Sequence, residues 1–168
     1  VETRGQASFA KLGVDTLRFY LDGESPLVHA LHELLLNSAS RVQIAAAEGQ
    51  PAVEPLELPA SCLRPVGLGE SEGLLDYDPR SFLGYRLIQE YFVLPEKFLF
   101  VDLAGLDLRR FARGIDIRFL IAPFGRQERL GRLEQTVGRD TFKLHCTPIV
   151  NLFSQPAEPM RLTHELHE

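Results

Sequence analysis

Histidine and cysteine side chains are the groups in this sequence that could bind a metal ion. They fall into three groups: His29 with His32 and Glu33, His145 with Cys146, and His164 with His167. Two histidines three residues apart can share a metal, but structural zinc sites combine two closely spaced ligand pairs, and the H-E-x-x-H order of zinc hydrolases is absent. We therefore predict no metal site, no cofactor and no catalytic residue. A metal-dependent hydrolase that uses these His and Cys groups stays as the alternative function.

Carboxylates beside an arginine form the second candidate for chemistry. Asp76, Asp78 and Arg80 could act as an acid pair with an arginine clamp, but the same residues suit the cap and first turn of a helix, which we favour. Glu90 and Glu96 flank aromatic residues, where burial would raise the pKa of a carboxyl. No base or nucleophile lies near them in the sequence. Phosphate-binding glycine loops and the G-x-S-x-G nucleophile elbow are also absent.

The composition is that of an ordinary globular domain. The 168 residues are 45% hydrophobic and 24% charged, as in an ordinary folded domain. A formal net charge of -5 gives no field that would attract a polyanion, so no nucleic acid partner is expected. The basic residues are nearly all arginine, which suits interfacial ion pairs and favours an assembly protein, although a GC-rich genome would give the same bias.

The sequence carries no membrane or secretion signal. Apolar runs such as Leu34–Leu36 and Phe98–Val101 are far shorter than the roughly 18 to 20 residues of a membrane span, so no direct membrane insertion is expected. Val1 opens the chain without the charged and apolar regions of a signal peptide. Both ends are abrupt, and we expect a fragment of a longer protein. Cys62 and Cys146 lie outside any C-x-x-C, which predicts reduced thiols in a cytoplasmic protein.

Hydrophobic periodicity predicts that residues 1–168 form a single α+β domain, with a mixed sheet and about three main helices packed on it. The predicted strands cover residues 16–21, 41–47, 98–103, 115–121 and 142–146. The predicted helices cover residues 26–38 with Ser25 as the N-cap, the stretch between Asp78-Pro79 and Pro95, and residues 126–137. Residues 49–73 are rich in proline and glycine, which predicts an irregular segment with short extended pieces or a boundary between two halves. Prolines also predict an irregular tail from Pro148.

The helix before Pro95 is apolar on nearly every side. Its candidate site residues are Phe82, Tyr85, Ile88, Tyr91 and Phe92. A helix that is apolar all round must be covered all round, so these side chains belong either to the domain core or to an interface with a partner protein.

Three stretches of the sequence form long motifs in a fixed order. They are residues 17–22 with the leucine-rich helix that follows, residues 77–92 continuing into 94–103, and residues 146–153 with 157–162 after them. In this order they resemble the TssF (ImpG/VasA) family, baseplate subunits of bacterial type VI secretion systems, over nearly the whole chain. One departure is Leu83, where the family motif carries a proline.

This resemblance implies a non-enzymatic, structural role. TssF-like proteins form the wedges of a cytoplasmic baseplate docked at the inner membrane, together with TssG and further TssF copies. They also connect to TssK, to TssE and to the VgrG/Hcp spike hub. Family members are several times longer than this chain, so the resemblance implies that residues 1–168 are an internal domain of such a subunit. It implies no catalytic residue and no cofactor.

Overall fold

The computed structural model describes residues 1–78, 80–122, 133, 136–156 and 158, and it confirms the α+β class. The helices are α1 (Phe9–Leu12), α2 (Ser25–Asn37) and α3 (Leu83–Val93), with the short 3-10 helices η1 (Ala60–Cys62), η2 (Glu70–Glu72) and η3 (Pro95–Leu99). The strands are β1 (Thr16–Leu21), β2 (Ala39–Ala46), β3 (Leu56–Pro59), β4 (Leu63–Pro65), β5 (Phe100–Ala104), β6 (Ile115–Ile121) and β7 (Phe142–Lys143). No helix among these residues is long and apolar enough to cross a membrane.

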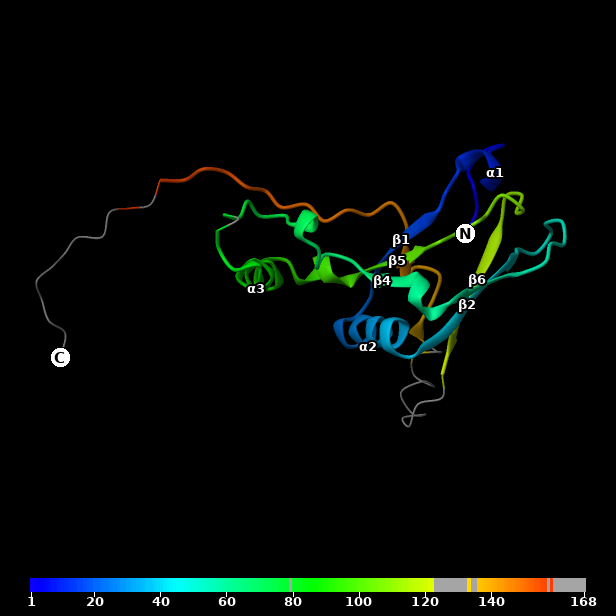
Figure 1. Ribbon diagram of the computed structural model, residues 1–168, viewed down its shortest axis with the longest axis horizontal. Helices are drawn as coiled ribbons and strands as arrows, with labels where there is room; N and C mark the ends of the chain where they lie inside the picture. Colours follow the sequence, from blue (N-terminus) through cyan, green and yellow to red (C-terminus); the bar gives the residue numbers. More distant parts are fainter. Residues whose placement is uncertain (79, 123–132, 134–135, 157, 159–168) are drawn as a thin grey trace, which may run out of the picture.

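The strands form two antiparallel sheets, which corrects the prediction of one mixed sheet (Figure 1). One sheet has the order β4-β5-β1-β7 and the other the order β3-β2-β6. The central position of β5 agrees with its sequence, since a strand that is apolar on both faces must be covered on both faces. The strand starts at Phe100, because the two residues before it complete η3.

The proline-rich and glycine-rich segment at residues 49–73 joins the two sheets. Its extended pieces were predicted, and they become β3, which pairs with β2, and β4, which pairs with β5. Only the three residues of η1 separate these two strands. The segment therefore carries the chain from an edge of one sheet to an edge of the other.

Helix α2 covers the core, and it begins and ends one residue earlier than the predicted range 26–38. Val28, Leu31, Leu34 and Leu35 are its buried residues. Glu24, not Ser25, occupies the N-cap position, and its side chain makes no cap hydrogen bond. Ser25 is the first helical residue, and its carbonyl oxygen lies 2.6 Å from Nδ1 of His29. The N-cap prediction was therefore wrong by one position.

The C-terminal part of the chain agrees with the prediction less closely. The predicted helix at residues 126–137 lies outside the described residues except for its last part, where Leu133 is helical and buried and Thr136 is helical. The predicted strand at 142–146 is shorter, because His145 adopts a left-handed conformation with a φ of 61°. The described tail from residue 147 has no regular secondary structure, as its prolines predict.

Phe142 links the two sheets through aromatic contacts. Its ring packs edge-on against Phe19 of one sheet, with the centroids 5.8 Å apart, and stacks on Phe119 of the other at 5.6 Å. Aromatic pairs in these geometries stabilise a fold beyond the area that they bury.

We predict that Phe142→Ala lowers the free energy of unfolding by about 2 to 3 kcal/mol, because it leaves a cavity between the sheets. Urea denaturation followed by circular dichroism measures this change. The matched control is Phe153→Ala, since Phe153 is exposed and its removal leaves no cavity. Equal denaturation midpoints for the two variants would contradict the prediction.

Candidate interaction surface

Helix α3 buries its charged side chains and exposes most of its apolar ones. Arg86 and Glu90 are its two fully buried residues, with exposed fractions of 5% and 1%. The spacing of four residues places both on one side of the helix. Lys97, in η3 directly after α3, is 2% exposed and reaches the same point. The side of α3 that faces the body of the molecule is therefore ionic.

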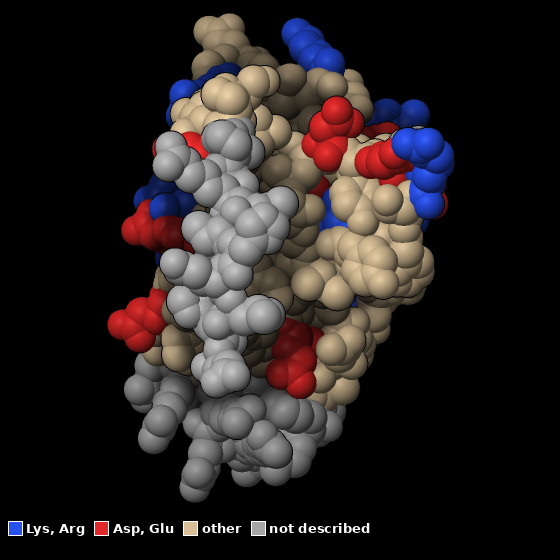
Figure 2. All heavy atoms as spheres, turned by 90° about the vertical axis from the view of Figure 1, so that its left-hand side faces the viewer, with Lys and Arg blue, Asp and Glu red and all other residues tan. Residues whose placement is uncertain are grey.

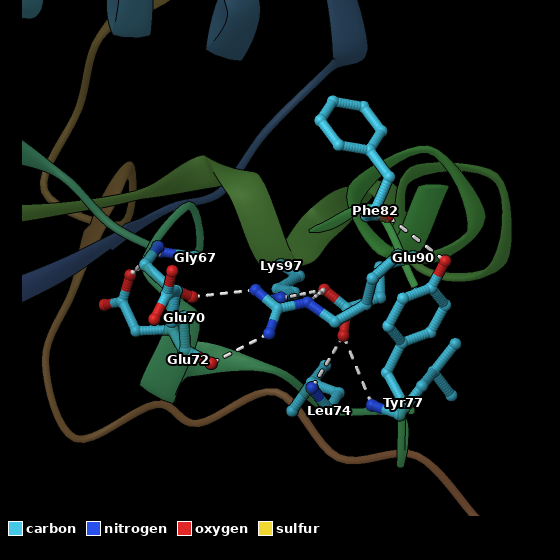
Figure 3. A network of polar contacts seen from close by, with 11 residues as sticks. Gly67, Glu70, Glu72, Leu74, Tyr77, Phe82, Glu90 and Lys97 are labelled. Atoms are coloured by element: carbon cyan, nitrogen blue, oxygen red, sulfur yellow. Dashed lines mark hydrogen bonds and ion pairs between the residues drawn. The ribbon is translucent and has the colours of Figure 1, made fainter. Parts of the chain in front are cut away.

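Glu90 is the centre of a buried polar network (Figure 3). Its Oε1 accepts hydrogen bonds from the backbone N–H groups of Leu74 at 2.7 Å and Leu75 at 3.2 Å. Its Oε2 accepts a hydrogen bond from Nζ of Lys97 and lies 3.9 Å from Nε of Arg86. The carboxylate thus meets two cations and two amides at a site that water does not reach.

Arg86 and Glu90 fasten α3 to residues 67–75, which we call the clamp loop. The Arg86 guanidinium donates hydrogen bonds to the carbonyl oxygens of Gly69 at 2.7 Å and Glu70 at 2.8 Å. Within the loop, Oε2 of Glu72 accepts hydrogen bonds from the N–H groups of Gly67 and Gly69. Gly67 has a φ of +96°, and a Cβ there would lie 3.2 Å from the Lys97 carbonyl oxygen, so this close approach requires glycine.

The pKa of Glu90 is set by this network. Burial alone raises the pKa of a carboxyl, which is the direction that the sequence predicts. The hydrogen bonds from Lys97, Leu74 and Leu75 stabilise the charged form and outweigh the burial, so the pKa of Glu90 lies below its ordinary value of 4.5. The predicted rise in the pKa of Glu90 was therefore wrong, because the sequence does not show that loop amides donate hydrogen bonds to this carboxylate. Glu96 is exposed.

The outer side of α3 forms an exposed apolar surface. We call it the apolar face, and its residues are the five predicted ones, Phe82, Tyr85, Ile88, Tyr91 and Phe92. Each exposes between 51% and 80% of its surface. Phe82 packs edge-on against Tyr85, and Tyr91 against Phe92, so the rings hold one another in place. Figure 2 looks onto the end of the molecule that carries α3. These five side chains therefore lie at the surface of the described residues and not in the domain core.

The predicted acidic pair beside an arginine is neither an acid pair nor a helix cap. Asp78 accepts hydrogen bonds from the backbone N–H and the guanidinium of Arg80, which lowers the pKa of Asp78. Both residues are exposed, and α3 begins only at Leu83, with Phe82 at the N-cap position. The pair lies before the helix in the sequence, and Pro79 is outside the described residues. Asp76 is also exposed, and it is part of neither an acid pair nor a helix cap.

The histidines and cysteines do not converge in the described part of the chain. His29 and His32 lie on α2, where burial and the neighbouring His29 lower the pKa of His32, and His145 and Cys146 follow β7. Among the described residues no three His, Cys, Asp or Glu side chains are placed to hold a metal ion. His164 and His167 lie outside the described residues. Cys62 is buried, Cys146 is half-buried, and both are free thiols.

Three comparisons relate this chain to known proteins. The family described as type VI secretion system, TssF matches residues 1–168. The type VI secretion system component TssF1 of Pseudomonas aeruginosa (strain PAO1) is 39% identical over 162 residues, which are 95% of this chain and 25% of that protein. A chain in the solved structure of the type VI secretion system TssK-TssF-TssG baseplate subcomplex has a TM-score of 0.63 and 25% sequence identity. That match covers 89% of this chain and 27% of the other, so this chain spans about a quarter of the length of these relatives.

We predict that Glu90→Gln lowers the free energy of unfolding by about 3 to 5 kcal/mol, because it leaves the Lys97 and Arg86 charges buried without a counter-ion. Chemical denaturation measures the loss. Glu96→Gln is the matched control, and a change at an exposed residue of this kind stays within about 0.5 kcal/mol. A Glu90→Gln variant as stable as the Glu96→Gln variant would show that the network does not hold the helix.

The lowered pKa of Glu90 also predicts a dependence of stability on pH. A carboxyl whose pKa is lower in the folded than in the unfolded protein stabilises the fold above its ordinary value, here 4.5, and that contribution is lost as the pH falls. The unmodified chain should therefore lose stability more steeply than Glu90→Gln between about pH 5 and pH 3. Parallel curves of denaturation midpoint against pH for the two proteins would contradict this prediction.

Proposed function

The chain belongs to the TssF family of type VI secretion systems, and from this premise we propose that it is a non-enzymatic, structural domain of the secretion baseplate. The relative solved in a TssK-TssF-TssG baseplate subcomplex supports assembly with TssK and TssG. In the same proposal, the whole subunit pairs with further TssF copies. It contacts TssE and the VgrG/Hcp spike hub, and it works in the cytoplasm at a baseplate docked to the inner membrane.

The observation that carries this function is the orientation of α3. Its apolar face holds aromatic side chains at the surface, and aromatic residues dominate the energy of protein interfaces. The helix cannot turn this face inward without removing Arg86 and Glu90 from their buried partners, which would be costly. A partner protein that covers the apolar face would remove it from water, and we propose that TssG is that partner.

The core supports the proposal that residues 1–168 act as one internal domain of the subunit. A continuous cluster of buried residues includes Leu21 and Leu103 of the four-stranded sheet and Val42 and Ile44 of the three-stranded sheet. A rigid body of this kind can hold α3 in a fixed position relative to the rest of a baseplate wedge. The alternative of a metal-dependent hydrolase receives no support from the described His and Cys residues, and we do not propose it.

We predict that the double variant Tyr85→Glu and Tyr91→Glu loses co-purification with TssG, with an affinity at least about 30-fold lower, because the loss of even one aromatic hot spot costs about 2 kcal/mol or more. Co-expression of the full-length subunit with TssG, followed by affinity purification and titration calorimetry, measures the effect. Both tyrosines are exposed, so the fold should keep its stability.

The matched control is Leu12→Glu. Leu12 is an exposed apolar residue on α1, which lies away from α3 (Figure 1). The Leu12→Glu variant should bind TssG as the unmodified protein does. If the double variant binds as well as the control, the apolar face is not the TssG contact.

A further inference from the structure

The three-stranded sheet has an edge that the described residues leave largely unpaired. It is the outer edge of β6, since β6 pairs with β2 on its other side. In an antiparallel pair, alternate residues direct their backbone N–H and C=O groups to the partner, and the residues between them direct these groups away. The N–H of Ala47 donates to the carbonyl oxygen of Gly114, in register with the β2–β6 pairing. By this alternation, Ile115, Ile117 and Phe119 direct their backbone groups to the outer edge.

The first residues of the chain already lie on this outer edge. The main-chain nitrogen of Val1 donates a hydrogen bond to the carbonyl oxygen of Ile115 at 2.8 Å, and the N–H of Ile115 returns one to Val1 at 2.9 Å. The N–H of Thr3 donates to the carbonyl oxygen of Arg113 at 2.8 Å. The bridge between these two positions is antiparallel. The chain therefore starts as a short antiparallel strand on β6, beside which Figure 1 marks the N-terminus.

This pairing sets the direction of any residues that precede Val1. In an antiparallel pair, each step backward from Val1 is a step forward along β6, from Asp116 towards Ile121. Residues directly before Val1 would therefore run along the outer edge. Beyond Ile115, no described residue forms a backbone hydrogen bond with that edge. An edge with unpaired backbone groups is a template for another strand.

The side chains of β6 indicate which residues would suit such a strand. Residues opposite one another in an antiparallel pair have their side chains on the same face of the sheet. The second and fourth residues before Val1 would lie opposite Ile117 and Phe119, which pack against the core, so apolar side chains suit these two positions. The first and third would lie opposite Asp116 and Arg118, which are exposed, so polar side chains suit these.

A cavity beside Val1 provides room for the apolar side chains. Its volume is about 730 Å³, and its lining includes Val1, Phe142 and Leu144. Phe142 also stacks on Phe119 of β6, so the cavity adjoins the core-facing side of that strand. Apolar side chains that enter the cavity would leave water and extend the core between the two sheets.

We propose that, in the full-length subunit, the residues directly before Val1 continue as a strand on the outer edge of β6, antiparallel to it and in register with the pairing of Val1 and Ile115. This chain spans about a quarter of the length of its relatives, so a subunit of their length has further chain to supply the strand. A segment tethered at Val1 reaches this edge at a higher effective concentration than a separate partner protein does. The inference rests on the proposed role of residues 1–168 as an internal domain, and it does not involve the TssG contact of α3.

Disulfide trapping in the full-length subunit tests the strand and its register together. The register places the third residue before Val1 opposite Arg118 in a non-hydrogen-bonded pair, where the Cα atoms lie about 4.5 Å apart, which suits a disulfide. The test variant combines Arg118→Cys with a cysteine at that third position. The matched control combines Arg118→Cys with a cysteine at the second position, whose side chain lies on the opposite face. After oxidation, peptide mapping should find at least about 10-fold more of this cross-link in the test variant than in the control.

Hydrogen exchange of β6 in the unmodified full-length subunit supplies the second readout. The amides of Ile117 and Phe119 should exchange slowly in the free subunit, because the preceding strand accepts their hydrogen bonds. Addition of TssG should leave their exchange unchanged. Rapid exchange in the free subunit that slows only with TssG would assign the edge to that partner and overturn the inference.

The cross-linking outcomes are equally decisive. A cross-link that is absent from both variants, or as frequent in the control as in the test variant, would overturn the proposed strand. A covalent dimer in place of the cross-link within one subunit would assign the edge to a second copy, and would also overturn it. TssG binding by the unmodified subunit is measured alongside. Its absence would overturn the proposed TssG contact and leave the strand on β6 unaffected.

Discussion

The buried contact of Glu90 with Lys97, Arg86 and two loop amides is the constraint on which the arrangement of α3 depends. An ionic cluster of this kind contributes little net stability compared with a well-packed apolar one, but breaking it is expensive. Its consequence is orientation. Because α3 is apolar on most sides, packing alone would allow several rotations of the helix about its axis. The charges select the one that leaves the aromatic side chains outside.

The cluster is tied to the rest of the fold through one sheet. Lys97 lies in η3, which leads directly into β5, and the clamp loop follows β4, the neighbour of β5. Lys97 and the loop amides that contact Glu90 therefore belong to segments next to two adjacent strands, and both segments hold the helix. The exposed side of α3 is thus positioned by this one junction.

Local pattern predicted much of this fold. The alternation in residues 16–21 and 115–121 and the leucine stripe of α2 each depend on neighbours within a few positions, and they agree with β1, β6 and α2. The separation into two antiparallel sheets was missed, because strand pairing joins residues such as Phe19 and Val101 that are far apart in sequence. The sequence identified the five residues of the apolar face, but it did not predict that they are exposed. The sequence signal for this orientation was a pair of charged residues, Arg86 and Glu90, four positions apart in an apolar helix. Their burial is explained only by the hydrogen bonds from the amides of Leu74 and Leu75.

Side-chain labelling of Tyr85 and Tyr91 tests the central claim most directly. Hydroxyl radicals modify a tyrosine in proportion to its exposure, so the labelling of both can be compared in the free subunit and in its complex with TssG. The orientation imposed by Glu90 predicts strong labelling of both tyrosines in the free subunit and protection of both in the complex. Weak labelling of both in the free subunit would mean that α3 turns its apolar face inward, and it would contradict this account.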